Sequence, residues 1–513
     1  MNSDVMEIGA GLLDLAGIRS FGTHTRVRLG DAMRQQVRRG HERLRAMIDK
    51  KQVVYGVNTG LGPLSSRVLE ADQAPQLQQR LLLSNAVGVG PELDPQIVRL
   101  VLLLKVLTLS QGASGVSPAL VDRLLLFLNE GLTPVIPSQG SVGASGDLAP
   151  LAHVGCALIG VGEVRLNGER MTAATAHERL GLMPYVPLAK EGLAIVNGTQ
   201  VSTAIALYAY FQIERSFIFG LAAAALSLEA GRGTVQAFDA RLHHLRRQKG
   251  QVRVAQWLRD VLQNSPLQDA AAQAQRRRVQ DPYCLRCIPQ VLGAVFDQLT
   301  HVAQVLDREI AAVTDNPLID LDTGDVMYGG NFHAQPIGFC ADLMAMCVTE
   351  MSTMSERRTA FLVDGHQSGL PDFLVDGNGL DSGFMVAQVT AAALASENKA
   401  MSFPASVDSI PTAANLEDHV SMATHAAFRL LKMIGNLENI LSIELLAAAQ
   451  GLDFLRPGKT SDLLEDLHAG LRREVDFWSE DRYFAPDIPL ALAVARRFAN
   501  QLGQNSRFGL FSC

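Results

Sequence analysis

One stretch decides how this chain is interpreted: Gly140-Ser141-Val142-Gly143-Ala144-Ser145-Gly146-Asp147-Leu148-Ala149-Pro150. It sets three small residues, Ala144, Ser145 and Gly146, between a glycine-rich entry and an expected helix start. Because glycine has no side chain, the Gly146 amide nitrogen could curl back onto the Ala144 carbonyl carbon. Ring closure with loss of one water, and of a second water from Ser145, would leave a five-membered ring with an exocyclic methylidene. Such a ring is an electrophile that none of the ordinary side chains supplies.

A helix is predicted directly after this tripeptide, over the apolar run Leu148–Leu158. Its positive end would stabilise negative charge growing on the ring when a nucleophile adds. The pattern alone also allows a plain glycine-rich turn, since such turns are common. A second copy of the tripeptide lies in Gln111-Gly112-Ala113-Ser114-Gly115, and neither copy has the Gly-x-Ser-x-Gly spacing of serine hydrolases.

Residues 140–153 resemble the signature of the histidine and phenylalanine ammonia-lyase family, and further matching blocks run from Tyr55 to Asp453. In that family the tripeptide cyclises autocatalytically to 4-methylideneimidazol-5-one (MIO). The resemblance implies that Ala144, Ser145 and Gly146 form MIO here, with no external cofactor and no metal. It also implies long helices packed into a homotetramer whose active sites are shared between chains.

Composition narrows the class of protein. The 513 residues are 48% hydrophobic and 19% charged, so some apolar surface is expected to be buried between subunits. The net charge of −7 argues against a nucleic-acid partner. Without an evident signal peptide, and with six cysteines that form no disulfide framework, a cytoplasmic protein is expected. Glu214 and Arg215 interrupt the apolar run Val201–Ala230, which favours a buried helix over a membrane span.

The pattern divides the chain near residue 200. Residues 1–200 are mixed and broken, and a hairpin is predicted at Glu163–Met171 around the turn Asn167-Gly168. This smaller N-terminal region carries the tripeptide.

Residues 201–513 are dominated by long helical patterns, so the predicted fold is mainly α, a long-helix bundle with the mixed N-terminal region attached. A second hairpin is predicted at Leu318–Tyr328 around the turn Thr323-Gly324, and the polar segment Arg241–Gln280 is expected to be a surface arm. The long helices are predicted at Val201–Ala230, Gln290–Ala312, Pro336–Val363, Phe384–Ala400 and Glu417–Gln450.

Removal of a weakly acidic β-proton requires a base. Tyr55, in Tyr55-Gly56-Val57-Asn58-Thr59-Gly60, matches the catalytic tyrosine of the resembling family. A tyrosine is more often a packed side chain. Here the surrounding glycines indicate a loop that closes over the site.

A substrate carboxylate requires a cation that can bind both its oxygens. The segment Gln280-Asp281-Pro282-Tyr283-Cys284-Leu285-Arg286-Cys287 supplies the guanidinium of Arg286. Gln280, Tyr283 and Arg286 could share one helical face. By resemblance, Arg286 binds the carboxylate and the other two hydrogen-bond around the MIO and the substrate. An ordinary surface ion pair is the alternative role for Arg286.

Two further residues match the family's site. Asn197, before Gly198, matches an asparagine near the MIO carbonyl, and Phe332 matches an aromatic residue of the pocket. A turn and a core position are their alternative roles. His333 is expected to be structural.

Substrate choice depends on a second set of residues. Glu417, within residues 415–422 that resemble the histidine branch, stands where phenylalanine and tyrosine lyases usually carry glutamine. A carboxylate can pair with an imidazole or an ammonium group. Two departures from the histidine pattern are Ser84-Asn85, where Ser-His is usual, and Leu416, where glutamine is usual.

The leading hypothesis is therefore an MIO-dependent ammonia-lyase that eliminates ammonia from an aromatic L-amino acid, with L-histidine to trans-urocanate as the first choice of reaction. A tyrosine or phenylalanine lyase, or an aminomutase that adds the ammonia back at the β-carbon, is the alternative within the family. An inactive structural paralogue is a third possibility, which the intact motifs argue against.

Overall fold

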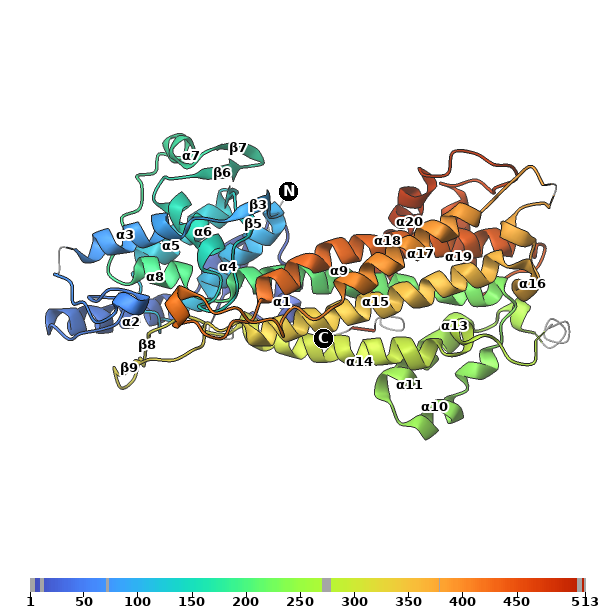
Figure 1. The fold of residues 1–513 in the computed structure, drawn as a ribbon, viewed down its shortest axis with the longest axis horizontal. Coiled ribbons are helices and arrows are strands. Elements are labelled where there is room, and N and C mark those ends of the chain that lie inside the picture. Colours follow the sequence, from blue (N-terminus) through green and yellow to red (C-terminus); the bar gives the residue numbers. More distant parts are fainter. Residues whose placement is uncertain are drawn as a thin grey trace. The chain divides into compact units, whose positions relative to one another are not determined.

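The computed structural model describes residues 5–9, 13–70, 73–269, 278–377, 379–504 and 510–511. Helices account for most of them, so the predicted mainly α fold is confirmed (Figure 1). The chain forms two compact units. Unit 1 comprises Met1–Tyr208, Ala303–Asp342 and Pro404–Phe428, and unit 2 comprises Ala209–Val302, Leu343–Phe403 and Arg429–Cys513. The two domains predicted on either side of residue 200 stay a prediction. The compact units differ from them in that two later segments are grouped with the N-terminal residues.

Unit 1 contains helices of mixed length with small sheets between them. Its helices are α1 (Leu15–Ser20), α2 (Asp31–Asp49), η1 (Gly62–Leu64), α3 (Ala74–Asn85), α4 (Pro95–Ser110), α5 (Pro118–Asn129), α6 (Leu148–Leu158), α7 (Ala173–Arg179), α8 (Glu191–Val196) and η5 (Ala413–Asn415). Its strands are β1 (Val5–Ile8), β2 (Arg26–Leu29), β3 (Val89–Glu92), β4 (Leu132–Pro134), β5 (Pro137–Gln139), β6 (Glu163–Leu166), β7 (Glu169–Thr172), β8 (Leu318–Ile319) and β9 (Val326–Met327).

Helix α4 belongs to the core of unit 1, because every side chain from Ile97 to Ser110 is buried. The helix begins where the Asp94 carboxylate accepts a hydrogen bond from the Gln96 amide at 2.7 Å, with Pro95 in the first turn. An apolar surface on all sides is typical of a helix enclosed by other elements.

Both predicted hairpins form. Strands β6 and β7 pair antiparallel around Asn167 and Gly168, whose φ values of 50° and 91° suit a tight hairpin turn, and β4 adds a third strand. Strands β8 and β9 pair antiparallel, with Leu318 opposite Met327. The other sheets have two strands each: β1 with β2 in parallel, and β3 with β5 antiparallel.

All five long helices predicted from the pattern are present, and one begins later than expected. They are α9 (Gln200–Ala230), α14 (Ile288–Ile310), α15 (Gln335–Val363), α17 (Met385–Met401) and α18 (Ala423–Asp453). Helix α18 begins six residues after Glu417, because residues 412–417 form a turn in which Thr412 and Glu417 pair as an isolated bridge. Glu417 is therefore a loop residue.

The remaining helices of the described residues lie in unit 2: η2 (Val235–Phe238), α10 (Ala240–Arg246), α11 (Lys249–Val261), η3 (Pro266–Gln268), α13 (Tyr283–Arg286), α16 (Gly365–Ser368), η4 (Asp372–Leu374), α19 (Asp462–Arg472) and α20 (Asp487–Gln504). The expected surface arm Arg241–Gln280 agrees with residues 241–249, which are exposed except for His243, and is wrong for α11. Helix α11 within it buries Val254, Trp257 and Leu258, because its apolar residues recur at helical spacing; residues 270–277 lie outside the described residues.

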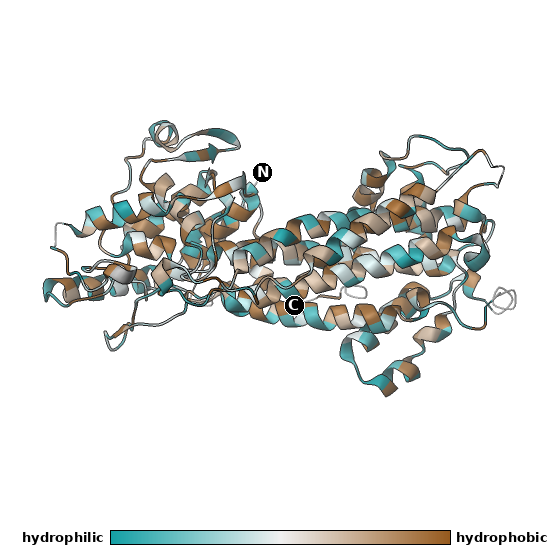
Figure 2. Cartoon of the chain, viewed as in Figure 1, coloured by the Kyte–Doolittle hydropathy of each residue, from teal (hydrophilic) through white to brown (hydrophobic). Residues whose placement is uncertain are grey.

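Two helices among the described residues, α9 and α15, are long and apolar enough to cross a membrane by length and composition. Their apolar windows are 83% and 67% buried inside the protein, as in the core helices of a bundle. Along α15, apolar residues (brown in Figure 2) recur among hydrophilic ones (teal).

Candidate active site

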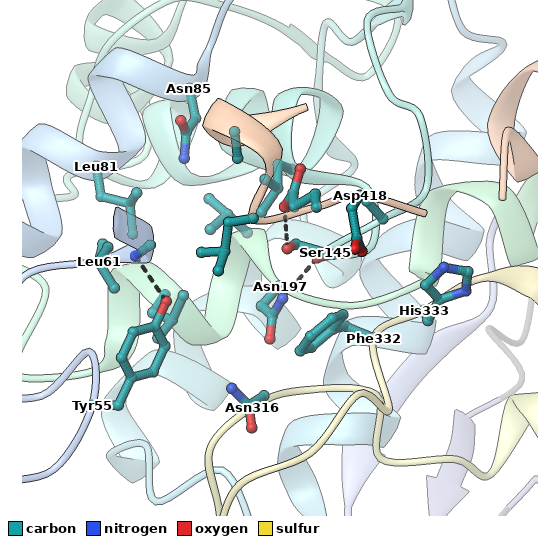
Figure 3. A pocket seen from close by; sticks show the side chains of 18 of the residues that line it. Tyr55, Leu61, Leu81, Asn85, Ser145, Asn197, Asn316, Phe332, His333 and Asp418 are labelled. Carbon is teal, nitrogen blue, oxygen red and sulfur yellow. Dashed lines mark hydrogen bonds between the residues drawn. The ribbon is translucent and has the colours of Figure 1, made fainter. Parts of the chain in front are cut away.

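Unit 1 contains a cavity of about 700 Å³ (Figure 3). It collects side chains from segments that are far apart in the sequence. Eight of the predicted site residues line it: Tyr55, Asn85, Ala144, Ser145, Asn197, Phe332, Leu416 and Glu417. Gly146 follows Ser145 without lining the cavity. Ser84 does not line it either, and its hydroxyl donates to the Leu81 carbonyl at 3.2 Å.

The tripeptide is held in a backbone conformation that suits glycine alone at its third position. Gly146 has a φ of +76° and pairs with Gly198, and the next amide, that of Asp147, donates to the Gly198 carbonyl at 2.8 Å. A Cβ at Gly146 would lie 2.2 Å from the Gly198 oxygen. Glycine is therefore required here by both φ and the close approach of two backbones.

The Asp147 carboxylate fixes this loop through hydrogen bonds. It is fully buried and accepts from the hydroxyls of Ser141 at 2.9 Å and Thr424 at 2.5 Å. It also accepts from the Ser202 amide at 2.7 Å and from the Ser202 hydroxyl at 3.0 Å. Helix α6 begins at Leu148 as predicted, with Asp147 at its N-cap position. The Asp147 side chain makes no capping hydrogen bond, because its oxygens accept from Ser141, Ser202 and Thr424 instead.

Asn197 and Glu417 contact the central residue of the tripeptide. The Asn197 side-chain amide donates to the Ser145 carbonyl at 2.7 Å. The Ser145 hydroxyl donates to one Glu417 carboxylate oxygen, and the Thr412 hydroxyl donates to the other at 2.6 Å. Asn197 is buried, and its own side-chain oxygen has no hydrogen-bond partner among the described residues. This set of contacts brings a carboxylate and an amide to the predicted reactive residue.

The residues present fit the ring that the resemblance implies. Gly146 approaches Gly198 so closely that only glycine fits, and this leaves the tripeptide bent. Asn197 donates to the Ser145 carbonyl, which is the carbonyl that the ring would keep. The N-terminus of α6 follows immediately, so its positive end lies beside the loop.

Tyr55 enters the cavity from the glycine-rich loop. Its hydroxyl accepts a hydrogen bond from the Gly62 amide at 3.0 Å, and Leu61 lines the cavity beside it (Figure 3). Gly56 has a φ of +67°, and its carbonyl accepts from the buried Gln78 side chain at 3.0 Å. The loop is thus fixed at its base while its phenol faces the cavity.

Asn85 and Leu81 lie four residues apart on α3, so they line the cavity from one helix face. With Leu416, they give this wall a mostly apolar surface carrying one neutral amide. The wall offers hydrogen bonds without charge.

The sequence interpretation missed several lining residues. His333 lines the cavity although it was expected to be structural, and Asn316, Asp418 and His419 line it too. The His333 and His419 rings stack with centroids 5.8 Å apart. Adjacency to Phe332 and Glu417 in the motifs was the signal that could have identified three of these four.

Gln280, Tyr283 and Arg286 belong to unit 2, and none of them lines the cavity. They do contact one another. The Arg286 guanidinium donates to the Gln280 side-chain oxygen at 2.8 Å and lies 4.7 Å from the centroid of the Tyr283 ring. Tyr283 is 68% exposed, which leaves this group of three open at the surface of the single chain.

Comparison with known proteins places this geometry in a family. A sequence model described as aromatic amino acid lyase matches residues 13–473. A histidine ammonia-lyase from Paracidovorax citrulli (strain AAC00-1) is 52% identical over 439 residues, which cover 86% of this chain and 85% of that one. A histidine ammonia-lyase from Idiomarina loihiensis (strain ATCC BAA-735 / DSM 15497 / L2-TR) is 48% identical over 486 residues, covering 94% and 95%.

Among solved structures, histidine ammonia-lyase from Trypanosoma cruzi superimposes with a TM-score of 0.90 at 34% identity, covering 99% of this chain and 98% of that one. The chain belongs to the aromatic amino acid lyase family. It is a carbon–nitrogen lyase of the histidine ammonia-lyase type.

Proposed function

We propose that residues 144–146 form MIO and that the protein eliminates ammonia from an aromatic L-amino acid. The first choice of substrate is L-histidine, whose product is trans-urocanate. One observation carries this proposal: Tyr55, Ser145, Asn197 and Glu417 face a single cavity, with Glu417 and Asn197 both bonded to Ser145. The relatives named as histidine ammonia-lyases support the choice of substrate.

The bound ring would supply an electrophilic methylidene that makes the substrate amine a better leaving group. The protein's own residues act on the ring and on the substrate. Asn197 donates to the Ser145 carbonyl, where negative charge would develop, and the positive end of α6 supports the same charge. The fit of the backbone around Gly146 keeps the loop rigid during the reaction.

Tyr55 and Glu417 act on the substrate. Tyr55 removes the β-proton as general base, a role that requires the phenolate form of its side chain. Glu417 faces the amine or the imidazole, for which a carboxylate is a hydrogen-bonding and electrostatic partner.

The substrate carboxylate is bound by Arg286, assisted by Gln280 and Tyr283, from another copy of the chain. Two features support a homotetramer with shared sites. These three side chains are grouped in the single chain, where Gln280 and Tyr283 are exposed and Arg286 is half-buried. Helix α17 also exposes Met385, Val386 and Val389, which are large apolar side chains suited to a subunit interface.

The cytoplasm is the proposed location. Among the described cysteines, Cys156, Cys284, Cys287, Cys340 and Cys347 are all free thiols, as expected in a reducing compartment.

The test is a panel assay of purified protein with histidine, tyrosine, phenylalanine and tryptophan, with ammonia and all organic products identified. Histidine should give the highest kcat/KM and urocanate as product. A retained β-amino acid would instead indicate the aminomutase, and a preference for phenylalanine or tyrosine would transfer the assignment to that lyase. No product from any of the four would leave the inactive paralogue.

Two variants test the wall of the cavity. A site with a polar ring partner discriminates strongly against analogues that lack it. Glu417→Gln should therefore lower kcat/KM for histidine and leave any phenylalanine activity unchanged or improved. Asn85→His should raise histidine activity. If the wild type forms no urocanate and Asn85→His restores none, histidine is the wrong substrate.

A further inference from the structure

Two lysines are fully buried at the two ends of the short helix α8. Lys190 precedes the helix, and its ammonium group is paired with Asp315 at 2.5 Å and donates to the Ser114 carbonyl at 2.9 Å. Lys105, on the core helix α4, is 1% exposed. Its Nζ donates to two backbone carbonyls, those of Ala194 at 3.1 Å and Asn197 at 2.9 Å.

These two carbonyls belong to the C-terminal end of α8, where the last carbonyls of a helix have no partner within the helix. A cation there satisfies them and interacts favourably with the negative end of the helix. Burying an ammonium group is costly, and burial indeed lowers the pKa of Lys105 to about 7, although Asp315 and Asp147 act to raise it. The two carbonyl hydrogen bonds offset part of this cost.

The role of Lys105 is indicated by the other contacts of Asn197. Its backbone oxygen is bound by Lys105, while its side chain donates to the Ser145 carbonyl at 2.7 Å. The following residue, Gly198, accepts from the Asp147 amide at 2.8 Å. Lys105 therefore fixes the backbone of the segment that contacts the reactive loop, from a position outside the cavity.

We propose that Lys105 is a positioning residue for Asn197, holding its backbone so that its side-chain amide reaches the Ser145 carbonyl. The proposal rests on the proposed function, in which that carbonyl carries developing negative charge. Neither protonation state removes the contact, because a neutral amine still has two N–H donors for the two carbonyls.

The same helix offers a matched control. Arg99 is also a buried cation on α4, 7% exposed, and its guanidinium also donates to two backbone carbonyls, those of Leu128 at 2.8 Å and Thr25 at 3.2 Å. Leu128 lies in the last turn of α5, so Arg99 satisfies a helix end just as Lys105 does. Neither of these carbonyls belongs to a residue that lines the cavity.

The experiment is a double-mutant cycle of Lys105→Met and Asn197→Ala, with Arg99→Met as control. Lys105→Met should lower kcat for histidine about 10²-fold, since small displacements of a positioned group have effects of that size. In the Asn197→Ala background, Lys105→Met should lower kcat by less than about twofold more, because its effect passes through Asn197. Arg99→Met should reduce thermal stability, change kcat by less than about twofold and act additively with Asn197→Ala.

A Lys105→Met protein with unchanged kcat, or single effects that multiply in the double variant, would overturn the proposal. If Lys105→Met does not fold, Lys105→Gln, which keeps one amide donor, must show a smaller loss and the same non-additivity. If the wild type has no activity on any amino acid, the proposed function fails separately. Hydrogen exchange then decides on Lys105: the Asp147 amide should exchange faster in the Lys105 variant and not in Arg99→Met, and equal protection refutes the role.

Discussion

Substitution of Gly146 by alanine should prevent ring formation, and the structure gives the size of the obstacle. The new Cβ would lie 2.2 Å from the Gly198 oxygen, whereas real Cβ contacts under 3.0 Å essentially never occur, so the two backbones must separate by about 0.8 Å (3.0 minus 2.2). The left-handed φ of +76° adds roughly 1–2 kcal/mol for a non-glycine residue. Loss of the hydrogen bond from Asp147 to Gly198 adds about 1 kcal/mol. The variant should therefore be less stable by about 3 kcal/mol and hold the tripeptide in the wrong geometry.

Gly115→Ala in the second tripeptide is the matched control. Gly115 has a similar φ of +71°, but its nearest neighbours are side-chain atoms, Ile319 Cδ1 at 2.8 Å and Leu44 at 3.2 Å, which can move. It should lose about 1–2 kcal/mol of stability, from its φ alone, and still form the ring.

The assay combines urea unfolding with the mass of the peptide that contains residues 144–146. Gly146→Ala should keep an undehydrated peptide, and Gly115→Ala should show the loss of two waters seen in the wild type. If Gly146→Ala forms the ring as the wild type does, the backbone approach to Gly198 does not govern cyclisation and the reasoning fails.

Three further predictions concern the base, the buried lysine and the assembly. Tyr55→Phe should keep the ring by peptide mass and lose about 10²–10⁴-fold in kcat, as for removal of a general base, and near-normal turnover would mean that another group takes the proton. Because the folded-state pKa of Lys105 is about 7 and its ordinary value is 10.5, only the unfolded state binds that proton in between. The stability of the wild type relative to Lys105→Met should therefore rise from pH 7 to pH 9 by up to about 1.4 kcal/mol per pH unit in urea titrations, and a constant difference would exclude the low pKa. Ser145→Ala and Arg286→Ala, each inactive alone, should regain activity when the two chains are co-expressed, and no recovery would mean that sites are not shared between chains.

Local signals in the sequence were sufficient for much of the fold. The hairpins followed from Asn167-Gly168 and from Thr323-Gly324, because those turns demand residues that tolerate positive φ. The long helices followed from unbroken apolar patterns. The position of Glu417 in a turn could not be predicted from the local pattern, since it depends on hydrogen bonds to Thr412 and Ser145. Ser145 is 272 residues away along the chain.

The candidate site was predictable as a set of residue types and not as a geometry. The motifs supplied Tyr55, Asn197 and Glu417. Lys105 stands out in the sequence as a charge within the apolar run Leu100–Leu109, but nothing there indicates that it contacts Asn197. Its partners are backbone carbonyls, which leave no residue signature. Contacts of this kind depend on tertiary structure alone.

The most direct test of the whole account is the mass of the tripeptide in catalytically active wild-type protein, compared with Ser145→Ala and Ser114→Ala. The peptide with residues 144–146 should be lighter by two waters in the wild type and in Ser114→Ala, both of which should release ammonia from L-histidine. Ser145→Ala should fold, show no methylidene and have almost no activity. An intact Ser145 in active wild-type protein would contradict the central claim.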